Sequence, residues 1–294
     1  MADRDQTLPD QILPDATAMG VLTLRAGDLT ALVAYYQQAL GLTEIASDAD
    51  GVLLGRGATG LVRIADGHGL VLPPRTEAGL FHTALLFTDR SDLADTVAAA
   101  LRRPEGRYVG AQDHAVSQAF YFQDPENNGI ELYWDRPRDT WQWQRGAVHM
   151  TVDPLDGRAF LDEYQRHDTP QADPATVGHV HLQVGDIATA HDFYVGTLGF
   201  AATARLGETA LFVSAGGYHH HMAMNVWNSA GAGPRRNTLG LGRVDIAVPS
   251  TADVAALRER LDAAGVPVTV QDDARGGALV TADPWRNEIR VSAP

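Results

Sequence analysis

Short strands of apolar or alternating residues recur four times along the chain, at 21–26, 82–87, 179–184 and 243–248. After each strand comes a segment with apolar residues at helical spacing, and further β-rich runs follow that segment. The order strand, helix, strands therefore occurs four times. We expect four βαβββ modules, at 19–67, 79–135, 178–227 and 239–294.

Half of the chain resembles the other half. The helix-like segment 28–42 recurs at 186–200 with a constant offset, and each copy starts at an Asp suited to cap a helix and ends near a Gly. A second pair, 124–132 and 283–291, is typical of a turn that leads into a final strand. Between the second and third modules lies a polar connection, 136–177, with a short predicted helix around 160–164.

Composition and charge narrow the function. The chain has 294 residues, 45% of them hydrophobic, which is enough to fill two cores. Its formal charge of −14 repels nucleic acids and anionic lipid surfaces, so we expect neither as a partner. The chain contains no cysteine, so any metal must be bound by nitrogen and oxygen ligands. The polar segment 1–14 and the lack of a long apolar run favour a cytoplasmic protein.

Three motifs carry a resemblance to a known family: Gly-His-Val-His-Leu at 178–182, Ser-Ala-Gly-Gly-Tyr-His-His-His at 214–221, and the run 124–134, which ends in Gly-Ile-Glu-Leu-Tyr-Trp. With them the chain resembles the glyoxalase, bleomycin-resistance and extradiol-dioxygenase superfamily, also called the vicinal oxygen chelate (VOC) superfamily. It looks most like the two-domain catechol 2,3-dioxygenases. The resemblance implies an α+β fold in which the four modules form two cupped mixed β-sheets with flanking helices. It also implies a first VOC domain at 16–135 and a second at 178–294.

The resemblance also indicates where a metal would bind, because ligands in this family come from the first and last strands of the modules. The first-strand positions are Val21, His82, His179 and Arg243. The last-strand positions in modules two, three and four are Glu131, Met224 and Arg290. Valine has no donor atom, and a guanidinium would repel a cation. Modules two and three alone keep ligands, so we predict that they pair with each other and leave modules one and four to pair separately.

The expected ligands are His82, His179 and Glu131, a set of two histidines and one carboxylate typical of Fe(II) oxygenases. Mn(II) or another divalent metal is the alternative ion. His181 should share a strand face with His179, and it is the lesser candidate for the same ligand position.

Three further residues match the family's catalytic positions. Tyr121 stands ten residues before Glu131, where its hydroxyl would contact the substrate. His220 matches an acid and base residue near the end of module three. The place of a second active-site histidine is held by Gln112, and His114 is its nearest substitute.

The resemblance therefore predicts an extradiol dioxygenase that opens the ring of a catecholic substrate with O2. Aromatic side chains expected to wall the substrate ring are Phe122, Tyr133, Trp134 and Trp227. One alternative is a glyoxalase-type lyase or isomerase, which would need a second carboxylate where Met224 stands. Another is a resistance protein that sequesters a ligand without a metal. A homo-oligomer is left open.

Overall fold

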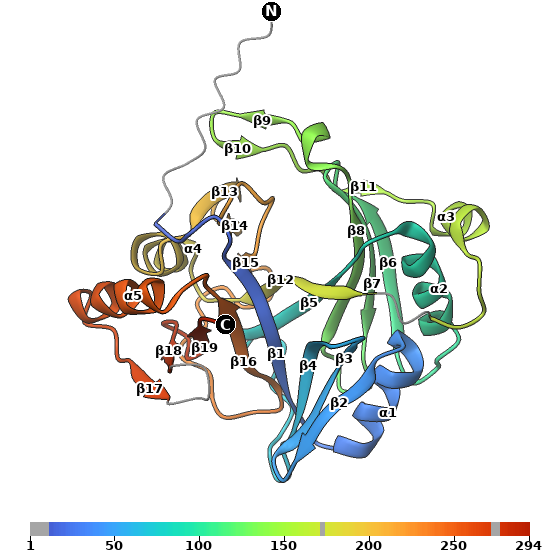
Figure 1. Ribbon diagram of the computed structural model, residues 1–294, viewed down its shortest axis with the longest axis horizontal. Helices are drawn as coiled ribbons and strands as arrows, with labels where there is room; N and C mark the ends of the chain where they lie inside the picture. Colours follow the sequence, from blue (N-terminus) through green and yellow to red (C-terminus); the bar gives the residue numbers. More distant parts are fainter. Residues whose placement is uncertain (1–11, 171–173, 272–276) are drawn as a thin grey trace, which may run out of the picture.

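The computed structural model describes residues 12–170, 174–271 and 277–294. Two large sheets form the fold (Figure 1). The nine-stranded sheet has the order β11 (Asp153–Pro154), β6 (Arg107–Asp113), β7 (Ser117–Gln123), β8 (Gly129–Asp135), β5 (Gly79–Phe87), β12 (Ala175–Gln183), β15 (Met222–Asn225), β14 (Ala210–Ser214) and β13 (Ala201–Leu206). The eight-stranded sheet has the order β17 (Thr269–Gln271), β18 (Ala278–Ala282), β19 (Glu288–Ser292), β16 (Gly240–Ala247), β1 (Ala18–Ala26), β4 (Thr59–Asp66), β3 (Gly51–Arg56) and β2 (Thr43–Asp48).

Each predicted module is present as one strand, one helical segment and three strands, which confirms the α+β fold. The helices are α1 (Leu29–Leu40), α2 (Arg90–Leu101), α3 (Gly157–Tyr164), α4 (Ile187–His191) and α5 (Thr251–Ala263), with a 3₁₀ turn η1 (Arg138–Thr140) and a π-helical turn η2 (Asp192–Thr197). Helices α1, α2 and α3 lie along one flank of the molecule, and α4 and α5 lie along the other (Figure 1). Among the described residues, no helix is both long and apolar enough to cross a bilayer.

The sheets pair the modules as the ligand pattern predicted. Strand β5 of module two runs antiparallel to β12 of module three, and β1 of module one runs antiparallel to β16 of module four. Each sheet therefore contains one module from each half of the chain. The division of the chain into domains 16–135 and 178–294 stays a prediction.

The repeated helix begins as expected in both copies. Asp28 accepts a hydrogen bond from the backbone of Ala31, and α1 ends at Gly41, whose φ of 67° is left-handed and suits glycine. Asp186 caps α4 through the backbone of Thr189 in the same way. The second copy then widens into the π-helical turn η2, which the repeat did not predict.

The two sheets pack back to back through their central strands. Leu22 and Leu24 of β1 belong to the same buried cluster as Val180 and Leu182 of β12. Because side chains alternate between the faces of a strand, the residues between them point away from this core into the two cups. The cup face of β12 therefore carries His179, which is how a hydrophobic core positions a polar site.

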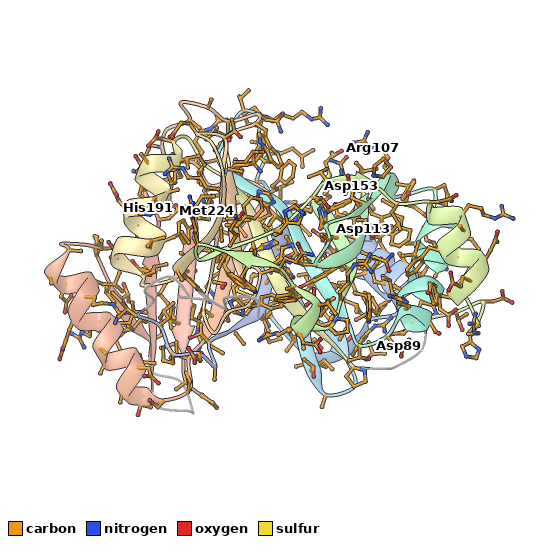
Figure 2. All side chains as sticks on the ribbon, turned by 90° about the horizontal axis from the view of Figure 1, so that it is seen from above. Asp89, Arg107, Asp113, Asp153, His191 and Met224 are labelled. Carbon is orange, nitrogen blue, oxygen red and sulfur yellow. The ribbon has the colours of Figure 1, made fainter. Side chains whose placement is uncertain are left out.

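The central connection is more ordered than a spacer. It contains the predicted helix as α3, but also a hairpin of β9 (Trp143–Gln144) and β10 (Ala147–Val148), and the edge strand β11. At β11 Asp153 lies beside Asp113 of β6 (Figure 2). Strand β10 contacts β13 at the opposite edge of the nine-stranded sheet, so the connection bridges both edges of one cup (Figure 1). Module three also begins earlier than predicted, at Ala175.

Buried tyrosines tie the modules of each half together. Tyr36 of α1 donates to Asp124 Oδ2 at 3.2 Å, and in the second half Tyr194 donates to Asp283 Oδ2 at 3.0 Å. Each Asp also accepts backbone hydrogen bonds within its own turn, as the repeated turn motif predicted. Burial raises the pKa of Asp124, and its hydrogen bonds, including the one from Tyr36, oppose that rise. The resulting pKa is about 6.

Removing the hydroxyl that reaches Asp124 should destabilise the protein. We expect Tyr36→Phe to lower the free energy of unfolding by about 1–3 kcal/mol, because it removes a donor from a buried carboxylate. Tyr35 is the matched control, since its buried hydroxyl makes no hydrogen bond to any described residue. Tyr35→Phe should leave stability unchanged or raise it, because it removes a buried hydroxyl that makes no hydrogen bond. Urea unfolding of both variants measures the difference, and equal losses would show that the Asp124 contact contributes nothing.

Candidate metal centre

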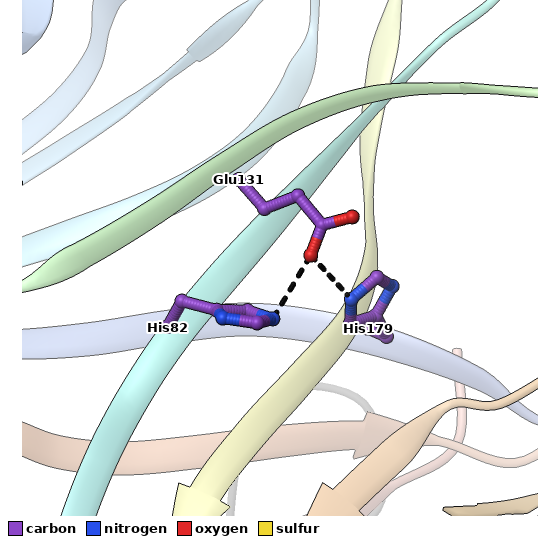
Figure 3. A group of neighbouring side chains, drawn as sticks. All are labelled: His82, Glu131 and His179. Atoms are coloured by element: carbon purple, nitrogen blue, oxygen red, sulfur yellow. Dashed lines mark hydrogen bonds and ion pairs between the residues drawn. The ribbon is translucent and has the colours of Figure 1, made fainter. Parts of the chain in front are cut away.

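Two histidines and one glutamate converge at the floor of the nine-stranded cup (Figure 3). They come from three neighbouring strands: His82 from β5, Glu131 from β8 and His179 from β12. Both imidazoles reach the same carboxylate oxygen, since Glu131 Oε2 lies 2.9 Å from His82 Nε2 and 3.1 Å from His179 Nε2. All three side chains are buried. The predicted ligand residues therefore lie together in one cup, with donor atoms within 4.8 Å of one another.

Strand register explains this convergence. Ala84 on β5 is paired with Glu131 on one side and with His179 on the other, and His82 lies two residues earlier on the same face. A bulge in β12 falls at Gly178, just before His179. A side chain at that position would collide with the hydroxyl of Tyr133, so glycine is required there.

The chemistry of the group fits a divalent metal ion. Burial lowers the pKa of His179 to about 4, so its imidazole is neutral near pH 7. Burial by itself would raise the pKa of Glu131, but His179 and His82 hold it well below its usual range. A neutral imidazole on His179 beside an ionised carboxylate is what a cation site needs.

His181 is engaged elsewhere. Its Nε2 lies 2.9 Å from the side-chain amide nitrogen of Asn225, which can only donate, so Nε2 is the acceptor. It therefore lies beside the group of three without belonging to it. The geometry favours His179 over His181 as the ligand from β12.

The other cup has the same register with different residues. Thr23 of β1 is paired with Arg63 on one side and with Arg243 on the other, as Ala84 is with Glu131 and His179. Arginines therefore stand at the two positions that match His179 and Glu131. Arg243 contacts Asp245 at 2.7 Å, and Arg290 contacts the same carboxylate at 3.5 Å. These positive charges disfavour a cation, and the lack of a metal site in modules one and four stays a prediction.

One predicted counterpart is wrong. Spacing to Trp227 selected Met224 as the position in module three that matches Glu131, but Met224 is paired with Leu182 and faces the core. The matching residue is Ala223, paired with His181 on the cup face. The count failed by one residue because Trp134 lies inside β8 whereas Trp227 lies beyond the end of β15, so the two tryptophans are not equivalent.

Tyr121 and His114 form a hydrogen-bonded pair beside the centre. Tyr121 on β7 is paired with Glu131, and its hydroxyl lies 2.7 Å from His114 Nε2. His114 Nδ1 lies 2.6 Å from the carbonyl oxygen of Thr151, so Nδ1 must donate and a neutral His114 accepts through Nε2. Tyr121 is therefore the donor to His114. Burial and the negative charge of Glu131 raise the pKa of Tyr121 well above its usual range.

His220 stands at the end of a hydrogen-bond chain that the sequence did not reveal. Asp135 Oδ1 lies 2.9 Å from His219 Nε2, and His219 Nδ1 lies 2.7 Å from His220 Nδ1. The carboxylate accepts, so a neutral His219 must accept from His220 Nδ1–H, which leaves the lone pair of His220 on Nε2. The His220 ring lies 4.1 Å from the ring of His179 and lines the cavity. The adjacent histidines at 219–221 were the signal, but strand pairing was needed to identify Asp135.

A cavity of about 680 Å³ opens onto these residues. Two of the aromatic residues predicted to wall the substrate, Phe122 and Trp227, line this cavity. Phe81 and Phe212 also line it and were not predicted. Tyr133 is fully buried, and Trp134 packs under the guanidinium of Arg90 at 3.9 Å, outside the cavity.

The central connection forms one wall of the cavity. Residues 147–152 line it, from β10 almost to β11, and Thr151 is the residue that orients His114. Sequence reasoning treated this stretch as a spacer. The alternation of apolar residues at Val148, Met150 and Val152 was a signal of a structured segment.

Comparison with known proteins agrees with this architecture. Residues 176–291 match the family described as the Glyoxalase/Bleomycin resistance protein/Dioxygenase superfamily. A catechol-2,3-dioxygenase from Bacillus subtilis (strain 168) is 39% identical over 203 residues, which are 68% of this chain and 70% of that protein. The chain belongs to this superfamily. Within the superfamily, its similarity to that protein relates it to the dioxygenases.

Solved structures share the fold at low sequence identity. A putative dioxygenase from Bacillus subtilis subsp. subtilis str. 168 has a TM-score of 0.66 at 13% identity, covering 94% of this chain and 84% of that one. Glyoxalase I from Zea mays has a TM-score of 0.57 at 16% identity, covering 94% and 92%. Because both a dioxygenase and a glyoxalase match, the fold alone does not choose the reaction.

The depressed pKa of His179 predicts how stability depends on pH. Unfolded His179 takes up a proton below about pH 6.5, whereas the folded metal-free protein holds it neutral down to about pH 4. The free energy of unfolding should therefore fall as the pH falls through this window, by about 2 kcal/mol between pH 7 and 5 for this residue. Urea unfolding of metal-free wild type and His179→Gln measures it. The variant should lose less stability on acidification, and equal pH slopes would contradict the assignment.

Proposed function

We propose that this protein is an extradiol dioxygenase that cleaves the ring of a catecholic substrate. The observation that carries the proposal is the convergence of His82, His179 and Glu131 at the floor of the cavity. The 39% identity to a catechol-2,3-dioxygenase supports the same reaction. The reaction breaks the ring C–C bond beside the diol and adds both atoms of O2 to the product.

The three residues would hold one divalent metal ion, and Fe(II) suits two imidazoles with one carboxylate. When bound, such an ion supplies open coordination positions and redox chemistry for a diol and O2. The chain itself buries the three side chains, keeps His179 neutral and keeps Glu131 ionised. The donor atoms are thereby organised before any ion arrives.

Tyr121 would orient the diol and receive a proton. Its hydroxyl donates to His114, so its oxygen keeps lone pairs that can accept from a substrate hydroxyl. A proton that moves from the substrate to this oxygen can be matched by transfer of the Tyr121 proton to His114 Nε2. Thr151 fixes the other nitrogen of His114 and so sets the direction of transfer.

His220 would act as base and then acid on the opposite side of the centre. Its Nε2 lone pair can take a proton, while its Nδ1 proton passes to His219. The resulting imidazolium of His219 would be paired with Asp135 at 2.9 Å, which stabilises the positive charge. Reversal of these steps returns the proton to the product.

The alternatives have less support. A glyoxalase-type site with a second carboxylate has no such residue here, because Ala223 occupies the position that matches Glu131. A ligand-sequestering protein without a metal would have no use for three buried metal-ligand side chains whose donor atoms lie within 4.8 Å of one another.

Metal content tests the proposed ligands. We expect one metal ion per chain in protein loaded anaerobically with Fe(II), measured by elemental analysis. Glu131→Gln keeps the size of the side chain but removes its charge, so it should lower metal affinity by at least about tenfold. Unchanged affinity would remove Glu131 from the ligand set.

The second cup provides the control. Val21→Ala combined with Arg290→Ala should leave the stoichiometry at one ion per chain and leave activity largely unchanged, because Arg243 and Arg63 still exclude a cation. Loss of the ion in this double variant would mean that the assigned cup is wrong.

The proton-transfer residues should affect turnover and leave the metal in place. His220→Ala should lower kcat by roughly 10²- to 10⁴-fold, the usual range for general acid–base groups. Tyr121→Phe should lower it by about tenfold, the cost of one hydrogen bond. Ring cleavage is followed by the yellow product and metal by elemental analysis. A variant that loses its metal would show that the residue acts as a ligand instead.

A further inference from the structure

The cavity is much larger than a catechol ring. A void of about 150 Å³ is enough to hold a benzene ring in a protein interior. The cavity measures about 680 Å³, several times that volume. A bare catechol at the metal centre would leave most of this space to water, so the cavity has room for a substantial substituent on the ring.

An apolar rim surrounds the outer end of the cavity. Its members are exposed yet line the cavity: Val152 is 70% exposed, Leu206 58%, Val109 56% and Trp227 49%. They come from different parts of the chain, namely the connection before β11, the end of β13, β6 and the segment after β15. Large apolar side chains that gather at a cavity mouth indicate contact with an apolar ligand.

Aromatic contacts join this rim to the metal centre. Phe81 lies next to His82 in the chain, and its ring is 5.3 Å from the ring of Trp227 in an edge-to-face arrangement. The same Trp227 ring is 5.5 Å from His181, whose face of β12 also carries His179. A continuous apolar surface thus runs from the ligand strands to the rim.

The cavity offers no unpaired cation to a negatively charged substituent. Among the described residues that line it, Arg205 is the sole guanidinium or ammonium. Its Nη2 lies 2.8 Å from both carboxylate oxygens of Glu208, and its Nε donates to the carbonyl of Gly207. The net charge of −14 further disfavours an anionic substrate.

We infer that the substrate is a catechol with a bulky, uncharged apolar substituent, whose diol lies at the metal centre and whose substituent extends to the rim of Val109, Val152, Leu206 and Trp227. This inference rests on the proposed ring-cleaving function. It adds that the outer cavity selects among catechols, and that the central connection contributes to this selection through Val152 and its neighbours.

A matched set of substrates tests the inference with the metal-loaded full chain. The set is catechol, propylcatechol and 3-(dihydroxyphenyl)propanoate, in which a carboxylate replaces the terminal methyl of the propyl group. We expect kcat/KM for propylcatechol, in its better ring isomer, to exceed that for catechol at least about tenfold, since each buried methylene contributes about fourfold. The carboxylate analogue should be poorer than propylcatechol by at least as much, because its charge would be desolvated without a partner.

A variant at the rim localises the effect. Leu206→Lys should lower the preference for propylcatechol over the carboxylate analogue several-fold, because it places a cation at the mouth of the cavity. Leu72→Lys is the matched control, since Leu72 is also half exposed but lies outside the cavity. This variant should prefer propylcatechol over the carboxylate analogue as strongly as the wild type does.

The outcomes separate the inference from the proposed function. If the metal-loaded protein cleaves none of these diols, the dioxygenase proposal fails. If kcat/KM for catechol equals that for propylcatechol, or if the protein prefers the carboxylate analogue, the proposed function stands and the inference is overturned. If Leu206→Lys leaves the preference unchanged and converts an oligomer to smaller species in solution, the rim is an interface between copies, and the inference is overturned as well.

Discussion

Antiparallel pairing of β5 with β12 is the constraint on which the centre depends. It is the contact by which a strand from each half of the chain places His82, His179 and Glu131 around the small side chain of Ala84. Without this pairing His179 would stand alone in one half, and His82 and Glu131 would remain together in the other. The same pairing joins the two sides of the cup, so the ligands and the cavity walls are held by one set of backbone hydrogen bonds.

The eight-stranded sheet supports this centre without chemistry of its own. Its central strands pack against the back of β5 and β12, and the positions that match His179 and Glu131 hold Arg243 and Arg63. Arg243 and Arg290 both contact Asp245, so their charges are paired inside the second cup. The Tyr36 and Tyr194 contacts link the modules of each half through their helices, while the sheets link the halves to each other.

Much of this arrangement follows from residue chemistry in the sequence. Val21 and Arg243 could not bind a cation, whereas His82 and His179 could, and that contrast predicted which modules pair. The sequence failed where the answer depends on register or on the path of a loop. A shift of one residue exchanges the two faces of a strand, so counting selected Met224 instead of Ala223. Asp135 meets His219, and Thr151 meets His114, across long separations that local pattern does not encode.

The long reach of the sheet pairing affects how the chain folds as it is synthesised. The antiparallel neighbour of β1 is β16, so Ala18 cannot pair until Ala247 has been synthesised. In the same way β5 cannot pair with β12 until β12 has been synthesised. While the first half emerges from the ribosome, both strands have an unpaired edge, a state in which chains fold slowly and associate wrongly. The candidate metal site requires His179 on a docked β12, so under the proposed function metal uptake would follow translation of more than half of the polypeptide.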